Sequence, residues 1–325
     1  MLTKNNKLLK IIGQFKGKKI LIVGDVMLDS AVWGKVERIS PEAPVPVVHV
    51  QRETYTAGGA ANVANNITAL GGQAVLIGLI GADRNGEIFR KVLKDKSIKP
   101  DYLLADHQRP TIRKNRIMAI PQHQLLRIDE EDVKPLGQAL EKKILEQIRS
   151  VLPKSEVVVI SDYAKGVISL PIAQQLIAWA RQKKIPVIID PKPFHKDYYR
   201  GATVIKPNKK EALEMSGTDK TMEAGRQLQQ ELGSSIVLTQ GEDGVAIFEP
   251  GQKPVSIKTK AREIFDVSGA GDTVVATLSL ALSGNARLRE AAEIANYAAG
   301  VVVGKVGTAT LDTTELKQAI KHDGQ

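Results

Sequence analysis

Short apolar runs recur along the chain and alternate with longer segments whose apolar residues have helical spacing. The first run, at residues 19–24, is Lys-Ile-Leu-Ile-Val-Gly, which is typical of a strand buried on both faces of a parallel sheet. Comparable runs predict further strands at residues 74–80, 157–161, 187–190, 203–206, 235–239 and 245–248. Other segments predict helices at about residues 60–70, 136–151, 170–183, 222–232, 270–282 and 288–304, and from about residue 209.

The regular alternation of strands and helices after residue 135 predicts an α/β fold. Strands and helices at this spacing are joined by right-handed crossovers. The strands should therefore form a mostly parallel central sheet with helices on both faces, a three-layer α/β/α sandwich. A chain of 325 residues can bury a large core, and we expect one domain spanning residues 1–325 rather than two.

Two segments interrupt this alternation and have the two-residue periodicity of half-buried strands. Residues 32–52 contain three prolines within six residues, which exclude both a helix and a central strand there. Residues 111–119 have a similar periodicity. Together they predict a small antiparallel β lid set apart from the main sheet. One face of this lid would be apolar and exposed to solvent unless another surface buries it. We therefore expect a homodimer formed through the lid.

Polar residues follow several predicted strands, which is where open α/β sheets bind their ligands. They are Asp25 and Asp29, then Asp162, Tyr163 and Lys165, then Asp190 and Lys192, and finally Lys206 and Asn208. One such acid is often only a cap, but three successive polar strand ends predict a cleft. We expect capping for Asp25, whereas Asp29 is a candidate for binding sugar hydroxyls.

Residues 264–282 run from an extended segment through Gly269, Ala270 and Gly271 into a helix of small apolar residues. Backbone N–H groups at such a helix start, with the positive end of the helix dipole behind them, form an anion-binding cradle. A carboxylate beside an anion is repelled unless it accepts a proton from an attacking hydroxyl, so Asp272 is a candidate general base. On this stretch alone, an N-capped helix in which Asp272 only favours the dipole is an equally good interpretation.

Three further motifs have both a functional and a structural interpretation. Asn208 and Glu211 lie one helical turn apart and are suited to hold the hydration shell of Mg²⁺, but their spacing is also that of a helix capping box. The glycines of residues 239–244 would let a nucleotide approach the backbone, although the segment alone predicts only a hairpin. Asn62 lies near a glycine-opened helix start, where it would reach a bound sugar or satisfy loop backbone.

Composition removes several classes of function. The formal net charge is +10, but the basic residues are scattered among acids and aromatic residues make up only 4%, which argues against nucleic acid and favours a small anionic substrate. The chain has no cysteine, and its five histidines show no metal-ligand spacing. No stretch of the sequence predicts a membrane span, so we expect a cytoplasmic protein without a membrane partner.

Two ordered motifs about 200 residues apart resemble the signatures of the ribokinase-like (PfkB) carbohydrate kinases. Residues 58–64 (Gly-Gly-Ala-Ala-Asn-Val-Ala), followed at family spacing by Gly71 and Gly81, resemble the first signature. Residues 266–272 (Asp-Val-Ser-Gly-Ala-Gly-Asp) resemble the second, although Thr277 replaces the generic Ala or Gly in the helix behind the site. The resemblance covers essentially the whole chain and implies a ribokinase-like fold and ATP-dependent phosphorylation of a carbohydrate.

The resemblance also implies a role for each candidate residue. The aspartate would deprotonate the acceptor hydroxyl, the glycine-rich backbone would stabilise the transferred phosphoryl group, and the asparagine and glutamate would organise Mg²⁺ through water. A monovalent-cation requirement stays open. The residues implied are, for catalysis, Asp272, Gly269, Ala270 and Gly271; for ATP, Asn208, Glu211, Thr239, Gly241 and Gly244; and for the sugar and its phosphate, Asp29, Gly59, Asn62, Lys114, Arg116 and Arg127.

Within the family, four segments are similar to members that phosphorylate D-glycero-D-manno-heptose 7-phosphate at its anomeric hydroxyl, a step toward ADP-heptose for lipopolysaccharide. They lie at residues 25–29, 38–47, 124–129 and 266–273. Many relatives continue into a nucleotidyltransferase domain, and we expect that activity to be absent from this sequence, which stops at Gln325. The nearest alternative is another sugar or sugar-phosphate kinase of the same fold. A sugar-binding regulator without catalysis is more remote, because Asp272 and the glycines beside it are intact.

Overall fold

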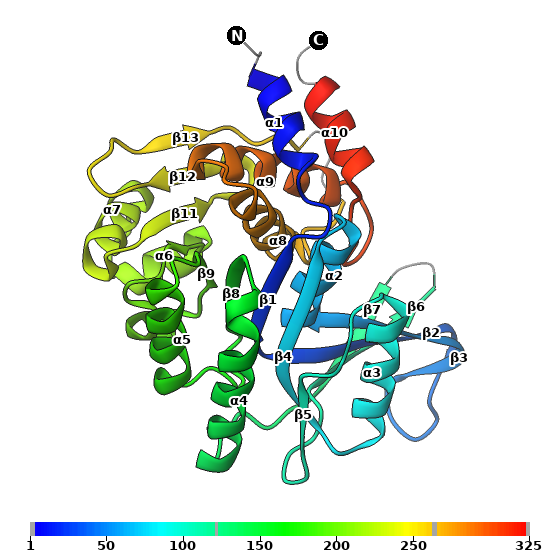
Figure 1. Ribbon diagram of the computed structural model, residues 1–325. Helices are drawn as coiled ribbons and strands as arrows, with labels where there is room; N and C mark the ends of the chain where they lie inside the picture. Colours follow the sequence, from blue (N-terminus) through cyan, green and yellow to red (C-terminus); the bar gives the residue numbers. More distant parts are fainter. Residues whose placement is uncertain (1–3, 121–122, 262–264, 323–325) are drawn as a thin grey trace.

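The computed structural model describes residues 4–120, 123–261 and 265–322. Nine strands within these ranges form one large sheet in the order β13-β12-β11-β10-β9-β8-β1-β4-β5 (Figure 1). The strands are β1 (Lys19–Gly24), β4 (Gln73–Gly81), β5 (Leu103–Asp106), β8 (Val157–Ser161), β9 (Val187–Asp190), β10 (Val204–Ile205), β11 (Ser235–Thr239), β12 (Val245–Phe248) and β13 (Val255–Ile257). The strands from β11 to β5 are mutually parallel. At one edge, β12 pairs in antiparallel fashion with β11, and β13 does so with β12. The predicted mostly parallel sheet is confirmed.

Helices cover both faces of this sheet and enclose two hydrophobic cores (Figure 1). β1 shows the division, because Ile20 and Ile22 belong to one core and Leu21 and Val23 to the other. The first core is covered by α1 (Lys4–Ile12), α2 (Ala60–Ala69), α3 (Arg84–Asp95), α8 (Ala270–Ser283), α9 (Leu288–Val302) and α10 (Thr313–His322). The second is covered by α4 (Gln138–Val151), α5 (Leu170–Gln182), α6 (Lys209–Ser216) and α7 (Thr221–Leu232). The expected three-layer sandwich is therefore present. In the part of the chain that the structure describes, no helix has the length and apolar character needed to cross a membrane.

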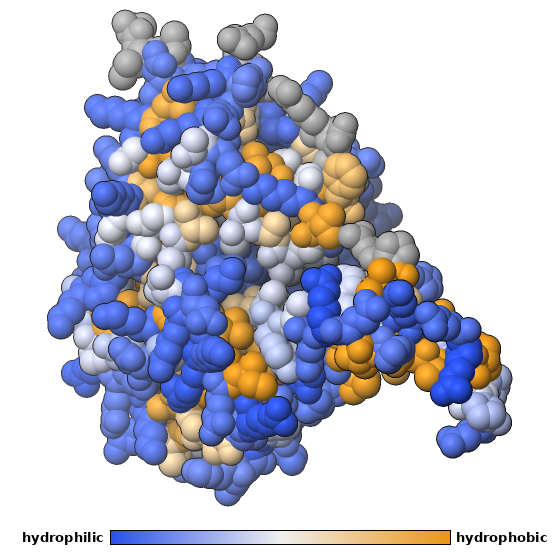
Figure 2. All heavy atoms as spheres, turned by 90° about the vertical axis from the view of Figure 1, so that its right-hand side faces the viewer, coloured by the Kyte–Doolittle hydropathy of each residue, from blue (hydrophilic) through white to orange (hydrophobic). Residues whose placement is uncertain are grey.

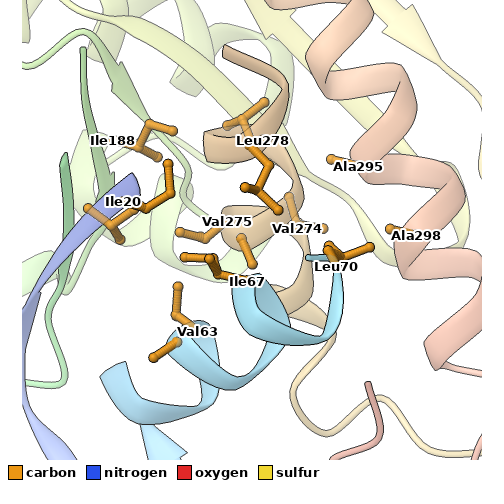
Figure 3. Close-up of a cluster of buried hydrophobic side chains, with 14 of the residues drawn as sticks. Ile20, Val63, Ile67, Leu70, Ile188, Val274, Val275, Leu278, Ala295 and Ala298 are labelled. Carbon is orange, nitrogen blue, oxygen red and sulfur yellow. The ribbon is translucent and has the colours of Figure 1, made fainter. Parts of the chain in front are cut away.

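Helix α8 is buried along almost its whole length, because small side chains let its neighbours approach closely. Figure 3 shows Val275 of α8 beside Ile67 of α2, with Ala295 and Ala298 of α9 on another side of the helix. Leu278 and Leu280 of α8 are also fully buried, and each contributes about 1.5–3 kcal/mol. This packing fixes the first turn of α8 at the carboxyl ends of the parallel strands.

A second, smaller sheet projects from the body and forms the lid (Figure 1). Its order is β3-β2-β6-β7, and its strands are β2 (Val26–Ile39), β3 (Pro46–Gly59), β6 (Arg113–Ala119) and β7 (His123–Glu130). The lid segments expected at residues 32–52 and 111–119 fall within it. The pair β2–β3 is antiparallel, as expected for the lid, but β2 and β6 pair in parallel. The reason is that both strands leave the carboxyl edge of the main sheet, β2 after β1 and β6 after β5. β7 lies outside both predicted segments and pairs with β6 in antiparallel fashion.

The lid begins earlier in the chain than the sequence pattern indicated. Only Asp25 separates β1 from β2, and β3 runs directly into α2. Val26, Met27 and Leu28 are buried apolar residues, so periodicity did not mark them as part of a half-exposed lid strand. The backbone N–H of Ala60 donates to the carbonyl of Asp25 at 2.9 Å, which ties the start of α2 to the start of the lid.

Candidate active site

The ends of β8, β9 and β10 and the start of α8 enclose a small cavity of about 190 Å³. Its walls combine the polar strand ends with the glycine-rich helix start: Asp162, Tyr163, Asp190, Lys192, Lys206, Asn208, Glu211, Gly269, Gly271 and Asp272. The cleft that the polar strand ends predicted is therefore present.

Among the residues that the structure describes, no side chain caps the start of α8 with a hydrogen bond. Gly269 precedes the helix with φ +80°, a left-handed conformation that favours glycine, and a Cβ there would lie 2.9 Å from Nδ2 of Asn62. Asp266 holds the preceding loop by accepting hydrogen bonds from the backbone of Ser268 (2.8 Å) and Gly307 (3.0 Å). The interpretation of this stretch as a helix capped by a side chain is therefore not supported, and its N–H groups suit an anion.

Asp272 lies on the cavity wall and is only 6% exposed. One carboxylate oxygen accepts a hydrogen bond from Nδ2 of Asn62 at 2.7 Å, and the other accepts one from the hydroxyl of Tyr163 at 2.9 Å. Burial and the charge of Asp190 raise the pKa of Asp272 to about 6, against the lowering effect of the two hydrogen bonds and of Lys206. A carboxylate with this pKa is mostly ionised at neutral pH and is a better proton acceptor than an ordinary aspartate.

Sequence reasoning missed Lys206 as a site residue, although its place at a strand end was the available signal. Its side chain is 4% exposed, and its Nζ lies 2.9 Å from Oδ1 of Asp190. Burial alone would lower the pKa of Lys206, but Asp190 and then Glu211 raise it, so the ammonium stays charged. A Cβ on Gly271 would lie 3.1 Å from this ammonium. A buried positive charge therefore lies beside the helix start, where an anion would bind.

A larger cavity of about 610 Å³ adjoins the first one. The two cavities share Lys206, Asn208 and Gly271. The residues expected to border the nucleotide all lie on the wall of the larger cavity: Thr239, Gly241 and Gly244. Apolar side chains line another part of it: Val245, Val267, Ala270, Val274 and Val303. The size and lining suit a nucleoside. β11 and β12 also form the hairpin that the sequence allowed, so the two interpretations of residues 239–244 are compatible.

Asn208 and Glu211 form the capping box of α6. The backbone N–H of each donates to the side chain of the other at 2.9 Å, and the second oxygen of Glu211 accepts a hydrogen bond from Lys192 at 3.1 Å. Across residues 4–120, 123–261 and 265–322, no three His, Cys, Asp or Glu side chains gather as a set of metal ligands. The pair therefore fits an Mg²⁺ ion that keeps its water shell, and does not fit one ligated directly by several side chains.

Asp29 lies in β2 of the lid, beside the glycines of the first motif. A Cβ on Gly58 would come within 2.3 Å of its Oδ2, so glycine makes room for this carboxylate. Its Oδ1 accepts a hydrogen bond from Nη1 of Arg116 at 2.7 Å. Gly59 has φ +59° and directly precedes α2. The amide of Asn62, which we expected to bind sugar, donates a hydrogen bond to Asp272.

Lys114 and Arg127 share a face of the lid with Arg116, because Lys114 is two residues away on β6 and Arg127 is opposite Arg116 on β7. Lys114 lies 3.0 Å and Arg127 lies 2.9 Å from the carboxylate of Asp129. These two cations are thus partly neutralised by one acid of the lid. Arg116 is paired instead with Asp29, the candidate sugar ligand.

Charges on this face of the lid act on residues near the cavity. Burial and nearby acids raise the pKa of Tyr163, and Asp29 is one of those acids. Burial alone would raise the pKa of Asp266, but backbone hydrogen bonds and the charge of Arg116 lower it. The charges of Asp29 and Arg116 therefore act on the residues around the start of α8.

A family model described as pfkB family carbohydrate kinase matches residues 17–315. The fold and the site thus define a phosphotransferase, and the chain belongs to the pfkB family of carbohydrate kinases. The resemblance found in the sequence is confirmed.

Curated relatives agree with this assignment. The chain is 40% identical over 316 residues to the bifunctional protein HldE of Desulfatibacillum aliphaticivorans, covering 95% of the chain and 64% of that protein. It is 43% identical over 302 residues to the bifunctional protein HldE of Geobacter sulfurreducens, covering 91% of the chain and 61% of that protein. It therefore spans less than two thirds of the length of these relatives.

Two solved structures show the shared fold. The structure of Arabidopsis thaliana ribokinase with ribose and ATP has a TM-score of 0.73 and 19% identity, and the match covers 94% of this chain and 99% of that one. The structure of Escherichia coli phosphofructokinase-2 with substrates and products has a TM-score of 0.76 and 19% identity, covering 95% of this chain and 100% of that one.

Replacing Asp272 with Asn should change stability in a pH-dependent way. Because folding raises the pKa of Asp272 from 3.8 to about 6, its ionisation opposes folding. This cost is absent below about pH 4, grows between pH 4 and 6, and is complete above pH 6. The free energy of unfolding of Asp272→Asn minus that of the unmodified protein should therefore rise through this window by up to about 3 kcal/mol.

Urea unfolding of both proteins from pH 4 to pH 8 measures this difference. Asp197→Asn, at an exposed acid outside the cavity, controls for loss of a surface carboxylate. A difference for Asp272→Asn that stays constant with pH would contradict the burial argument.

Proposed function

We propose that this chain transfers the γ-phosphate of ATP to the anomeric hydroxyl of D-glycero-D-manno-heptose 7-phosphate, giving the 1,7-bisphosphate used in ADP-heptose biosynthesis. The observation that carries the proposal is its identity of 40% and 43%, over more than nine tenths of the chain, to two proteins called bifunctional protein HldE. The four segments that resemble heptose phosphate kinases support the same substrate. We further propose that residues 1–325 act as a single kinase domain in the cytoplasm, where ATP is supplied.

In this proposal Asp272 accepts the proton of the anomeric hydroxyl as that oxygen attacks phosphorus. The elevated pKa of Asp272, caused by burial and by Asp190, supports this role because it makes the carboxylate more basic while leaving it ionised at pH 7 to 8. The hydroxyl must lie within about 3 Å of the carboxylate to be deprotonated.

The start of α8 and Lys206 stabilise the charge on the transferred phosphoryl group. The backbone N–H groups from Gly269 to Gly271 carry the positive end of the helix dipole, and Lys206 adds a full charge fixed by Asp190. These groups are already oriented before substrate binds, so little reorganisation is needed. Mg²⁺ held through water by Asn208 and Glu211 would neutralise part of the charge on the ATP phosphates.

The larger cavity would hold the nucleoside of ATP. Thr239, Gly241 and Gly244 border it, and the residues shared with the small cavity lie where the phosphates would pass from one cavity to the other. ATP would thus extend from the apolar pocket to the helix start, with its γ-phosphate next to Asp272.

The 7-phosphate would bind on the lid, and Arg116 is the best placed of the three basic candidates. It is bound to Asp29, the proposed sugar ligand, whereas Lys114 and Arg127 share the carboxylate of Asp129. A guanidinium also offers bidentate geometry to a phosphate. The sugar would then lie between Arg116 and Asp272, along the lid face that carries Asp29.

The substrate phosphate should control turnover. A charge-assisted hydrogen bond is worth about 1.5–3 kcal/mol, so two bonds from Arg116 should make kcat/KM for heptose 7-phosphate about 100-fold or more above that for free heptose. Because remote binding energy also positions the hydroxyl, kcat should fall as well as KM rise when the phosphate is missing. Steady-state kinetics with heptose 7-phosphate, free heptose and fructose 6-phosphate measure this preference.

Arg116→Ala should remove most of the discrimination, while the matched variant Arg127→Ala should retain it. Within each variant, the ratio of kcat/KM for heptose 7-phosphate to kcat/KM for free heptose is compared. This ratio cancels any effect of leaving Asp29 without its partner. Equal use of free heptose by the unmodified enzyme, or a preference for fructose 6-phosphate, would reject the heptose phosphate assignment and leave the kinase assignment intact.

We also propose that the protein is a homodimer formed through the lid. Figure 2 shows apolar side chains gathered on the projecting lid. The exposed apolar residues of the lid include Val36, Ile39, Val45, Val50, Ile120, Leu126 and Ile128. A half-exposed sheet of this kind is suited to pack against the same sheet of a second copy, because a two-fold interface is self-complementary.

Leu126→Asp should weaken this dimer, because a charge would be buried in the interface. Light scattering at micromolar concentration should give the dimer mass for the unmodified protein and a lower mass for the variant. Phe194→Asp is the control, since Phe194 is 87% exposed on the body outside the lid. A monomer mass for the unmodified protein would end the proposal.

A further inference from the structure

Tyr163 lies in the loop between β8 and α5 and contacts Asp272 directly. Its hydroxyl donates a hydrogen bond to one carboxylate oxygen at 2.9 Å, while Asn62 of α2 donates to the other at 2.7 Å. Its side chain helps line the small cavity, and the ammonium of Lys192 lies 5.3 Å from its ring centroid. The sequence marks this tyrosine only as part of a polar strand end.

The loop that carries Tyr163 is held by the fully buried carboxylate of Asp25. This carboxylate accepts hydrogen bonds from three backbone N–H groups, those of Tyr163 at 2.9 Å and of Lys165 and Val167 at 3.0 Å. Ala164, between them, has φ +53°, a left-handed conformation that non-glycine residues adopt only when their surroundings impose it. The capping role expected for Asp25 is therefore present, and it fixes the backbone of Tyr163.

A second buried acid fixes the same loop from the other side. Asp162 accepts a hydrogen bond from the backbone N–H of Ala164 at 2.7 Å. Its other oxygen accepts one from the hydroxyl of Tyr199 at 2.7 Å and lies 2.7 Å from Nδ1 of His195. Two anchored carboxylates therefore determine where the hydroxyl of Tyr163 lies.

We propose that Tyr163 is a positioning residue for Asp272, whose carboxylate it orients toward the acceptor hydroxyl. The inference rests on the proposed role of Asp272 as the base. Each carboxylate oxygen has two lone-pair directions. With one direction on each oxygen used by Tyr163 or Asn62, the carboxylate is prevented from rotating, and the remaining directions stay available to a substrate hydroxyl.

The hydrogen bond also affects the charge of Asp272. The charged groups on the walls around it are Asp162, Asp190, Lys192, Lys206 and Glu211. Lys192 is paired with Glu211, and Lys206 is paired with Asp190. Tyr163→Phe leaves all of them in place and removes only a donor to the ionised carboxylate. Since that donor lowers the pKa of Asp272, its loss should raise this pKa further.

The test is a double-mutant cycle of Tyr163→Phe and Asp272→Asn. Kinetics with the sugar substrate that is turned over fastest should show about a 10-fold lower kcat for Tyr163→Phe, with KM for sugar and ATP changed less than about twofold. The acidic limb of its pH profile of kcat/KM should move up by about one pH unit. In the Asp272→Asn background, the Tyr163 substitution should have no further effect, because the tyrosine acts through the carboxylate.

Tyr198→Phe is the matched control, because this half-buried tyrosine stacks on His195 at 4.4 Å and lies outside both cavities. It should leave kcat and the pH profile unchanged. If Tyr163→Phe folds poorly, fluorotyrosine at position 163 keeps the ring and strengthens the donor, so the acidic limb should move to lower pH.

The outcomes separate this inference from the proposed function. An unshifted pH profile for Tyr163→Phe, or an equal loss of kcat in the Asp272→Asn background, would overturn the positioning role while leaving the kinase assignment in place. Near-normal turnover by Asp272→Asn alone would overturn the base assignment and the inference together. A wrong sugar assignment would change which substrate is used and would not alter the cycle.

Discussion

The structure depends on keeping one carboxylate, Asp272, buried in the first turn of α8. Desolvation makes its charge costly, and the nearby Asp190 adds to that cost. Two hydrogen bonds and the charge of Lys206 offset it only in part. The rest of this free-energy cost must be offset by apolar packing. Helix α8 provides that packing, because it is buried between α2, α9 and the sheet (Figure 3). The same burial that weakens the fold makes the carboxylate basic enough to accept a proton near neutral pH.

The parts of the fold that were predictable from sequence are those with local signals. β8, β9, β11 and β12 match their apolar runs residue for residue, because each run ends abruptly at polar residues. Short edge strands such as β5 and β13 have no such run, and amphipathic α1, α3 and α10 lie outside the regular alternation. The parallel pairing of β2 with β6 was also unpredictable, since it is set by where two distant hairpins leave the sheet.

The candidate site likewise has features that the sequence indicated and features that it did not. The helix start at Gly269 and the pair of Asn208 and Glu211 are short motifs, so their spacing alone indicated their place. The contact of Asn62 with Asp272 joins residues 210 positions apart, and that of Tyr163 joins residues 109 positions apart. No local pattern carries that information. The motifs therefore indicated that Asp272 lies at the glycine-rich start of a helix, where the structure has it, but they did not reveal which side chains hold its carboxylate.

The single residue between β1 and β2 has a mechanical consequence. The carbonyl of Asp25 binds the first turn of α2, the helix that carries Asn62, while its carboxylate binds the loop that carries Tyr163. The lid continues directly from this residue. A rotation of the lid about that junction would therefore displace both hydrogen-bond donors of Asp272, Asn62 and Tyr163, at the same time. Asp25 therefore connects the position of the lid to both groups that hold the carboxylate of Asp272.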